Sequence, residues 1–451
     1  MNTINKNRSL PVAFASFLLA AGLAASAQAQ TAEAQPASDR AAPEDWGWHV
    51  QATSTTQKHG GFRSPYAAQN SLLPEESAKE TLDATLFLGR RLWQGAEFYI
   101  NPEIDQGYGL ANTLGMAGFA SGAAYKVGHD TPYGRLHRAF LRQTFALGEA
   151  GSEQDSAANQ LSGWRADDRV TLTLGKISVV DLFDNNRYAH DPRADFLNWA
   201  VIDGGAFDYA ADSWGFSVGA AAEWVQGPWT LRGGLYAMSK EPNTETLDGG
   251  FGQHQWLLEL EHRHEWLGHP GALRVLGFQT QARMARYEDL LALPQMPSDL
   301  APYRRFTNKQ GFVINLEQEL AQDLGLFARY SSNDGRTEAY DFTDINKSVS
   351  AGLQIQGSHW QQPTHSAGLA FARNELSDAA RRFFAAGGMG ILVGDGQLPH
   401  YQAEQITELY YAVRVASWLS VTGDFQRIVN PAYNADRGPV SVWGLRVHAE
   451  Y

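Results

Sequence analysis

The chain has 451 residues, contains no cysteine and carries a formal net charge of −13 at pH 7. The acidic balance argues against a nucleic-acid partner, because phosphate binding requires a basic surface, and the absence of thiols excludes disulfides. Aromatic residues make up 12% of the chain, yet its mean hydropathy is −0.35, a combination typical of an exported barrel with a wet lumen and aromatic rims.

The amino terminus predicts a secretory signal peptide over residues 1–29. Two basic residues precede an apolar stretch from Leu10 to Ala25, and the small-x-small cleavage pattern Ala27-Gln28-Ala29 follows. Cleavage removes both basic residues and changes the formal charge from −13 to −15. Residues 30–45 are rich in Ala, Pro, Glu and Ser without periodicity and predict a flexible periplasmic leader. No later run of about 18 apolar residues occurs, which excludes a helical inner-membrane protein.

From Trp46 onward, segments with the alternation of β-strands recur to the last residue. Glu80 to Trp93 and Glu97 to Asp105 are separated by Gln94-Gly95, which predicts a hairpin with a tight turn. The other segments are Trp48–Gln57, Arg135–Leu147, Asp168–Val179, Ser213–Val225, Pro228–Ser239, Gln255–Trp266, Ala272–Ala285, Gly311–Glu319, Leu324–Ser331, Ser348–Gln356, Ser366–Asn374, Glu404–Trp418, Leu419–Val429 and the closing segment, with Val201–Ala210 as an optional addition.

The closing segment shows the pattern most clearly. Its two faces are Trp443, Leu445, Val447, Ala449 and Tyr451 on one side, and Gly444, Arg446, His448 and Glu450 on the other. Apolar and polar residues alternate in this way in transmembrane barrel strands. The sequence therefore predicts an all-β fold, a transmembrane antiparallel β-barrel over residues 46–451, with 16 to 18 strands and 16 as the expected number.

Two long segments interrupt the alternation. Leu110 to Val127 is rich in Gly and Ala, and we expect it to fold into the barrel and narrow the channel, because long loops in compact folds are usually functional. Ser377 to Ala386 has a helical period, with Ser377 as its N-cap and glycines after its end. We place this helix in a second long loop, outside the barrel wall.

Three motifs suggest other chemistry. Residues 215–219 match the G-x-S-x-G pattern of serine hydrolases, but Trp214 and Phe216 are expected to continue the strand face instead of forming the strained turn that the nucleophile needs. His262 and His264 share a strand face and could chelate a metal ion, although histidines at a wet loop end explain them as well. Aspartates between 181 and 208 are spaced too irregularly for a glycosidase pair. A periplasmic hydrolase or binding protein is the less favoured alternative; we expect no enzyme and no cofactor.

Arg138 and Arg142 lie on one face of a predicted strand and would point together into the lumen. Guanidinium groups donate several hydrogen bonds in a fixed geometry, which suits sugar hydroxyls or anionic groups. A wet lumen also needs charged residues for solvation alone, so both interpretations stay open.

Spaced blocks along the mature chain resemble the OprB family of carbohydrate-selective porins. The blocks are Tyr99–Ile104, Gln106–Leu110, Ala117–Phe119, Leu141–Phe145, Gly175-Lys176, Asp181–Asn186, Phe196–Asn198, Gly394–Gly396, Asp424–Gln426, Asn430-Pro431 and Gly444–Arg446. The resemblance implies a 16-stranded barrel in the outer membrane of a Gram-negative bacterium that passes monosaccharides such as glucose by passive diffusion. The chain departs from the family at Tyr451, where Phe is usual. A branch with similar blocks, including residues 430–434, is labelled as manganese porins, so a divalent-cation (Mn²⁺) porin is the alternative function.

We expect the channel or its constriction to be lined by polar and charged residues of these blocks and strands: Asn101, Glu103, Arg138, Arg142, Lys176, Asp184 and Asn198. The weak metal candidates are His262 and His264. The expected partners are outer-membrane lipid and lipopolysaccharide, with small sugars or ions as permeant solutes. A monomer and a homotrimer are both compatible with the sequence, because lipid-facing strands and subunit contacts look alike.

Overall fold

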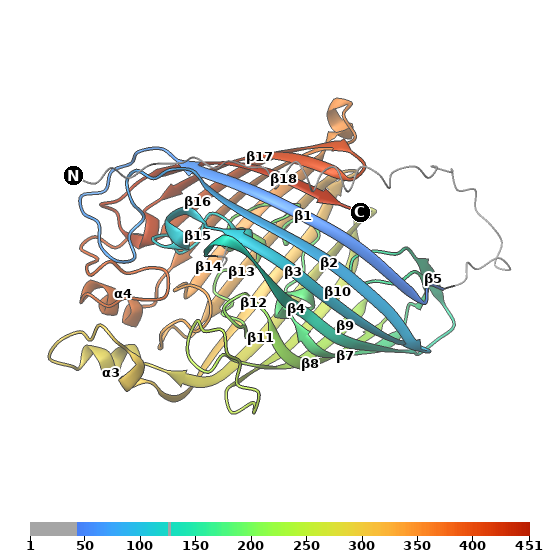
Figure 1. Cartoon of the computed structure of the whole chain (residues 1–451), viewed down its shortest axis with the longest axis horizontal. Helices are drawn as coiled ribbons and strands as arrows, with labels where there is room; N and C mark the ends of the chain where they lie inside the picture. Colours follow the sequence, from blue (N-terminus) through green and yellow to red (C-terminus); the bar gives the residue numbers. More distant parts are fainter. Residues whose placement is uncertain (1–42, 125–127) are drawn as a thin grey trace. The chain divides into compact units, whose positions relative to one another are not determined.

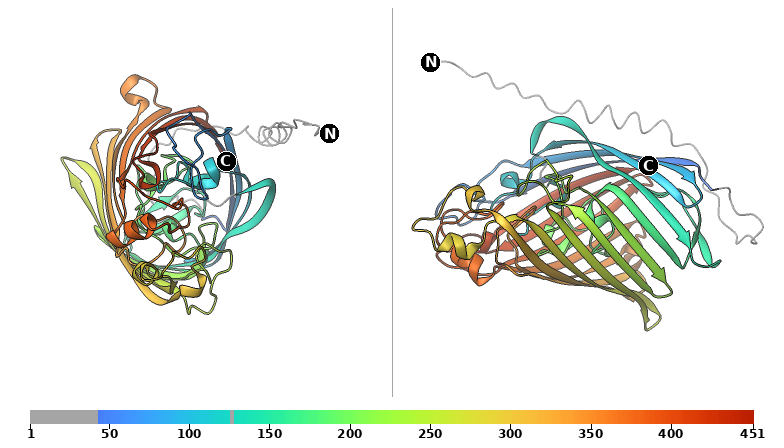
Figure 2. Two further views of the ribbon diagram at one scale, coloured as in Figure 1. Left: turned by 90° about the vertical axis from the view of Figure 1, so that its left-hand side faces the viewer. Right: turned by 90° about the horizontal axis from the view of Figure 1, so that it is seen from below.

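The computed structural model describes residues 43–124 and 128–451. The predicted signal peptide and residues 30–42 of the predicted leader lie outside this part of the chain. Sixteen antiparallel strands form a closed barrel (Figures 1 and 2), in which β1 pairs with β2 on one side and with β18 on the other. The first and last strands thus close the barrel, and every strand has two neighbours that satisfy its backbone hydrogen bonds.

The barrel strands are β1 Trp46–His59, β2 Lys79–Trp93, β3 Ala96–Gly107, β4 His129–Ala146, β7 Arg169–Ile177, β8 Ser217–Gln226, β9 Trp229–Ala237, β10 His254–Trp266, β11 His269–Met284, β12 Arg305–Ala321, β13 Leu324–Asn333, β14 Lys347–Gln356, β15 His365–Glu375, β16 Glu404–Ala416, β17 Leu419–Val429 and β18 Val440–Glu450. The predicted fold class and the expected sixteen strands are confirmed. A separate hairpin of β5 Gly151–Gln154 and β6 Gly163–Ala166, absent from the prediction, lies in the connection between β4 and β7.

The helical elements are short. They are η1 Leu110–Thr113, η2 Gly122–Ala124, η3 Val179–Asp181, α2 Trp199–Ile202, α3 Tyr287–Leu291, η4 Ala301–Tyr303, η5 Gly357–Trp360, α4 Asp378–Ala385 and η6 Pro431–Tyr433. Within the described ranges, no helix has the length and apolarity that crossing a membrane requires. The optional strand over 201–210 is wrong, because the chain there forms α2 and an irregular buried segment.

The predicted helix near residue 380 is confirmed. α4 begins after Ser377, whose Oγ accepts a hydrogen bond from the Ala380 amide at 3.1 Å. Its Phe383 packs on Tyr287 of α3, with ring centroids 4.7 Å apart. Both helices lie beyond the strand ends, at the end of the barrel that carries the long loops (Figure 1).

Alternation of side chains separates an apolar outer face from a polar inner one. On β18, Trp443 is 63% exposed on the outside, whereas the guanidinium-bearing Arg446 is 1% exposed inside. Arg446 donates to the carbonyls of Pro192 and Asp195 at 2.7 and 2.8 Å. The predicted faces of this strand are therefore confirmed, and the inward arginine binds a loop that fills the lumen.

The connections differ at the two ends of the barrel. The end that carries both described termini has mostly two-residue turns, such as Gln94-Gly95 between β2 and β3. The predicted hairpin there is confirmed. Gly95 has φ +75°, and a Cβ at this position would lie 2.2 Å from the Thr144 carbonyl oxygen, so the turn requires glycine. The only long connection described at this end is 147–168, which carries β5 and β6.

Two loops from the opposite end fold into the barrel. The predicted inward loop does so over residues 110–124: the amides of Ala117 and Gly118 donate to Glu404 of β16 at 3.0 and 2.6 Å. The larger inward segment, residues 178–216 between β7 and β8, was not predicted; we call it the inner loop. Its Phe183, Phe196 and Phe207 are fully buried, so an apolar core occupies much of the lumen.

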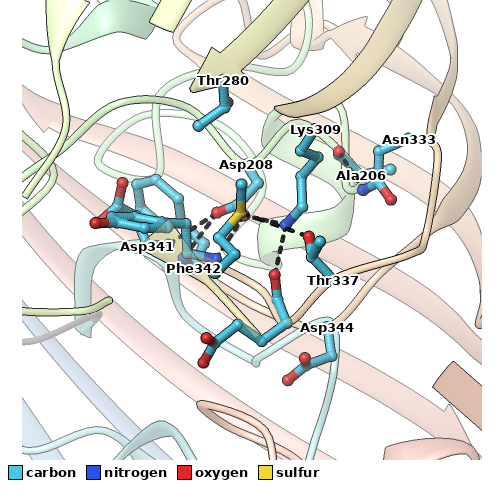
Figure 3. A network of polar contacts seen from close by, with 12 residues as sticks. Ala206, Asp208, Thr280, Lys309, Asn333, Thr337, Asp341, Phe342 and Asp344 are labelled. Carbon is cyan, nitrogen blue, oxygen red and sulfur yellow. Dashed lines mark hydrogen bonds and ion pairs between the residues drawn. The ribbon is translucent and has the colours of Figure 1, made fainter. Parts of the chain in front are cut away.

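Ion pairs attach the inner loop to the wall. Lys309 of β12 donates to Asp208 at 2.9 Å and to the carbonyl of Glu338 at 2.8 Å (Figure 3). Asp208 also accepts hydrogen bonds from the amides of Asp341 and Phe342, so the loop that follows β13 is joined to the same carboxylate. These contacts fix the inner loop at a defined depth in the barrel.

The outer face provides a test of the membrane orientation. Leu258 of β10 is 59% exposed on the outer face, between Trp256 and His262 on the same side. Leu258→Arg is expected to lower the free energy of unfolding by about 2–4 kcal/mol, because charged groups on the lipid face are most costly at the bilayer midplane. Gln279, which pairs with Trp256 across β10 and β11, lies nearer the membrane interface. The matched change Gln279→Arg should therefore lower the free energy of unfolding by only about 0–1 kcal/mol. Denaturant titration of the folded protein in lipid vesicles measures both; equal costs would contradict this orientation.

Candidate functional site

A cavity of about 950 Å³ lies between one part of the barrel wall and the inner loop. The wall side comes mainly from β2, β3, β4, β7, β8 and β9, and the connection 147–168 lines one end. Its charged lining residues are Arg91, Arg138, Arg142, Arg165, Arg193, Arg232, Glu97, Asp181, Asp191, Asp203 and Glu223, and its rings include Phe140, Trp164, Trp199, Tyr209, Trp214, Phe216 and Phe342. Guanidinium groups and aromatic faces thus share one polar cavity.

A β-bulge determines which residues of β4 reach the lumen. Asn101 of β3 pairs with Arg138, whereas the next residue, Pro102, pairs with Leu136, so His137 is the extra residue on β4. Proline has no amide hydrogen to donate to the ladder, which makes it compatible with an interrupted register. As a result, the consecutive residues His137 and Arg138 both face inward.

Arg138 is held in a fixed orientation at the cavity wall. Its Nε and Nη2 donate to the two carboxylate oxygens of Asp181 at 2.7 and 2.6 Å, a bidentate pair. Its Cζ lies 4.9 Å from the ring centroid of Phe216, and the Cζ of Arg135 lies 3.0 Å from that of Trp214. The two rings therefore lie against cationic side chains of β4.

Trp214 and Phe216 do not continue the strand as predicted. β8 begins at Ser217, and Gly215 before it has φ +91°, so the chain turns there and presents both rings to the cavity. Ser217 is in the strand, and its Oγ donates to the carbonyl of Ala237 at 2.6 Å. Ser217 therefore does not sit on the strained strand-to-helix turn that exposes the nucleophile of a serine hydrolase.

Behind this lining, a buried acidic cluster joins β2, β3 and β4 to the inner loop. Arg193 of the inner loop donates to Asp83 at 2.8 Å and to Glu103 at 3.4 Å. His137 Nε2 lies 3.1 Å from an oxygen of Asp105 and 3.5 Å from one of Glu103. Burial lowers the pKa of the Arg193 guanidinium, but the surrounding carboxylates outweigh that effect and raise it above its ordinary value.

Within residues 43–124 and 128–451, one group of ligand atoms could hold a metal ion: Glu103, Asp105 and His137 offer atoms within 4.8 Å of one another. The predicted candidates His262 and His264 are not part of it. They face outward with Leu258; the ring of His262 lies 4.2 Å from that of Trp229, and His264 Nε2 lies 3.0 Å from Gln318 Oε1.

Two more of the predicted channel residues, Asn101 and Arg142, lie on inward faces, whereas Lys176 shares its face of β7 with the exposed Leu172 and Leu174. Asn101 donates to the side chain of Asn159 at 3.0 Å, and Arg142 donates to the carbonyl of the same residue at 2.9 Å, so both hold the connection 147–168. Lys176 forms an ion pair with Asp212 at 2.9 Å. Of the seven predicted channel residues, Arg138 and Arg142 line the cavity, and Glu103 contacts it through Arg193.

Asp184 and Asn198 are fully buried and lie outside the cavity lining. Asp184 accepts hydrogen bonds from Arg329 at 3.2 Å and from the Gly204 amide at 2.6 Å. Asn198 caps α2 by accepting from the Ala200 amide at 3.0 Å. In the structure, both side chains hold the inner loop in place.

Four of the six aspartates between residues 181 and 208 have cationic partners on the wall or within the inner loop. The pairs are Asp181 with Arg138, Asp184 with Arg329, Asp203 with His190 and Asp208 with Lys309. Burial lowers the pKa of His190, but Asp203 outweighs it and raises that pKa to about 9, so this histidine is protonated at neutral pH. Such pairing gives these four aspartates a structural role in the inner loop.

Sequence reasoning missed several lining residues: Arg165, Arg193, Trp214 and Phe216. Arg165 lies in the small hairpin and Arg193 in the inner loop, where alternation gives no orientation, whereas Trp214 and Phe216 were assigned to the predicted strand Ser213–Val225, which begins only at Ser217. The available signals were weak: Arg193 is a basic residue inside an acidic run, and the two aromatic residues flank a glycine just before a strand.

The family model of OprB, described as carbohydrate-selective porin, matches residues 69–451. The high-pH structure of Pseudomonas putida OprB is similar with a TM-score of 0.67 and 17% identity, over 90% of this chain and 94% of that one. Its low-pH structure gives 0.49 and 13%, over 90% and 93%. The outer-membrane channel DcaP of Acinetobacter baumannii gives 0.49 and 10%, over 90% and 97%. No curated protein matches the chain.

Proposed function

The chain belongs to the OprB family of carbohydrate-selective porins, and from this premise we propose that it lets monosaccharides such as glucose diffuse passively across the outer membrane. The observation that carries the proposal is the cavity of about 950 Å³, in which arginine side chains and aromatic rings share one surface. Sugars offer hydroxyl groups to the guanidinium donors and apolar ring faces to the aromatic side chains.

The geometry of the lining suits weak and repeated binding. Because Asp181 holds Arg138 through two hydrogen bonds, the guanidinium is already ordered and loses little further freedom on meeting a solute. Phe216 lies beside Arg138 and Trp214 lies against Arg135, and both rings line the cavity, where a pyranose can slide along them. A channel solute must bind well enough to replace its water and weakly enough to leave.

Removing the rings of Trp214 and Phe216 tests this function. In liposomes, the native protein is expected to pass glucose and to show a conductance that glucose blocks at high concentration. The double variant W214A/F216A should bind glucose about 3–10-fold more weakly, since an aromatic contact contributes on the order of 1 kcal/mol, while ion conductance is kept or increased. The control W443A removes an outward ring and should leave both unchanged. Vesicles that conduct ions but exclude glucose would contradict the proposal.

Passage of a divalent cation is the second candidate, favoured by the cluster of Glu103, Asp105 and His137. Two carboxylates and an imidazole form a donor set that first-row divalent metals accept. Arg193 already donates to Glu103, which opposes a cation there. The same vesicles, loaded with a dye that Mn²⁺ quenches, distinguish the two candidate functions. Influx of Mn²⁺ without influx of glucose would favour a divalent-cation porin.

A further inference from the structure

Most charged groups of the cavity lining are paired. Arg91 lies 3.3 Å from Glu97, Arg138 binds Asp181, and Arg232 donates to Glu223 at 2.7 Å. Arg193 has Asp83 and Glu103 behind it. These pairs hold the guanidinium groups in place and neutralise them.

Two lining arginines, Arg142 and Arg165, differ from the others. In the described part of the chain, neither guanidinium has a carboxylate oxygen within the 4.0 Å of an ion pair. Arg142 donates to the carbonyl of Asn159 at 2.9 Å, and Arg165 donates to the amide oxygen of Gln154 at 3.2 Å. Both side chains are thus oriented by neutral acceptors and keep their full positive charge.

The two guanidinium groups line the same cavity, and their charges repel each other. Burial, together with the charges of Arg169 and Arg142, lowers the pKa of the Arg165 guanidinium to about 10, although Glu223 and Glu97 oppose the shift. Arg165 belongs to β6, outside the sixteen barrel strands. The Cζ of Arg142 lies 5.1 and 5.3 Å from the ring centroids of Tyr99 and Phe140, and Trp164 lines the same cavity. An anion between these guanidinium groups would relieve the repulsion.

We propose that Arg142 and Arg165 form a carboxylate-binding site in the channel, and that the protein passes sugar acids (uronate- or aldonate-type monosaccharides) more readily than neutral sugars of the same size. This inference rests on the proposed function, because it names the class of sugar within it. A guanidinium fork fits a carboxylate in a bidentate geometry, and the neighbouring rings contact the sugar ring.

Glucose and glucuronate provide a matched pair of probes, since they differ only at the sixth carbon. In proteoliposomes containing the full-length protein, glucuronate is expected to enter faster than glucose. The variant R142Q/R165Q should lower the ratio of the glucuronate rate to the glucose rate about fivefold, the order expected for removing partly buried charges. The variant R142K/R165K, which keeps both charges, should retain at least part of the preference.

Arg305→Gln is the control for a loss of charge as such, because Arg305 is exposed and donates only to backbone carbonyls at the long-loop end. It should leave the ratio unchanged, and heat-modifiability on a gel shows that each variant is folded. If glucose enters while the ratio is the same in the native protein and in R142Q/R165Q, this inference fails and the proposed function stands. If the native protein conducts ions but neither sugar enters, the proposed function itself fails.

Discussion

Replacing Asp208 by alanine is expected to release the inner loop and to lower the free energy of unfolding by about 3–5 kcal/mol, the usual cost of leaving a buried charge without its partner. Lys309 is 2% exposed, and Asp208 is its only carboxylate partner among the described residues. Single-channel recordings should show a larger and less steady conductance, because the loop that fills the lumen loses an attachment. Heat or denaturant unfolding in detergent measures the stability.

The double variant D208A/K309M separates the charge effect from the loss of hydrogen bonds. It removes both charges and should recover a large part of the stability, although the amides that donate to Asp208, including that of Tyr340 at 2.6 Å, stay without their acceptor. Asp378→Ala is the control, since Asp378 and its partner Arg381 lie on the surface and should contribute less than about 1 kcal/mol. Equal effects of D208A and D378A would contradict the role of the buried pair.

The pKa of the Asp208 carboxyl group determines the pH range over which it stabilises the folded state. Burial raises its pKa, but Lys309 and the amides of Asp341 and Tyr340 outweigh burial and hold the pKa below its ordinary value. A carboxyl group with a lowered pKa stabilises the folded state above the unfolded value of about 3.9. That stabilisation is lost as the pH falls through the lowered pKa.

The wall of the barrel was predictable because each strand repeats one simple rule. From Trp443 onward in β18, every second residue is apolar and faces outward, and the same alternation places Arg138 and Arg142 inside. The rule failed where the register changes: the bulge at Pro102 turns two consecutive residues inward, and Gly215 ends the alternation before Phe216. Local sequence carries little information on such interruptions, because they depend on the partner strand and on the loop that follows.

The contents of the lumen were less predictable for a different reason. The inner loop has no period, and its depth is set by contacts between residues more than a hundred positions apart, such as Asp208 with Lys309 and Asp184 with Arg329. Asp184 and Asn198 were expected at the channel because they are polar and lie in family-like blocks. In the fold, both side chains accept hydrogen bonds from backbone amides of the inner loop. These amides are buried away from water and therefore need an acceptor within the protein.

Asp344 is expected to make the packing of the long loops depend on pH near neutrality. It lies in the loop after β13, 2% exposed, and accepts hydrogen bonds from the Ile391 amide at 3.2 Å and the Tyr287 hydroxyl at 3.4 Å. Burial raises its pKa to about 7, with Asp208 adding to the rise and Lys309 opposing it. A carboxyl group with a raised pKa stabilises the folded state fully below the unfolded value of about 3.9, and this contribution is lost as the pH rises through 7.

The loops around Asp344 should therefore open more readily at pH 8 than at pH 5. Because the unfolded value of about 3.9 lies below pH 5, the contribution of Asp344 changes over only about two pH units between pH 5 and pH 8, which corresponds to about 3 kcal/mol as an upper value. Asp344→Asn, which cannot ionise, should remove most of this difference. Hydrogen-exchange protection factors for residues 388–393, which pack on this carboxyl group, give the local measurement. The control Asp378→Asn changes an exposed carboxyl group on α4 and should keep the native pH dependence. If protection is the same at both pH values in the native protein, or if D344N keeps the difference, Asp344 does not control this packing.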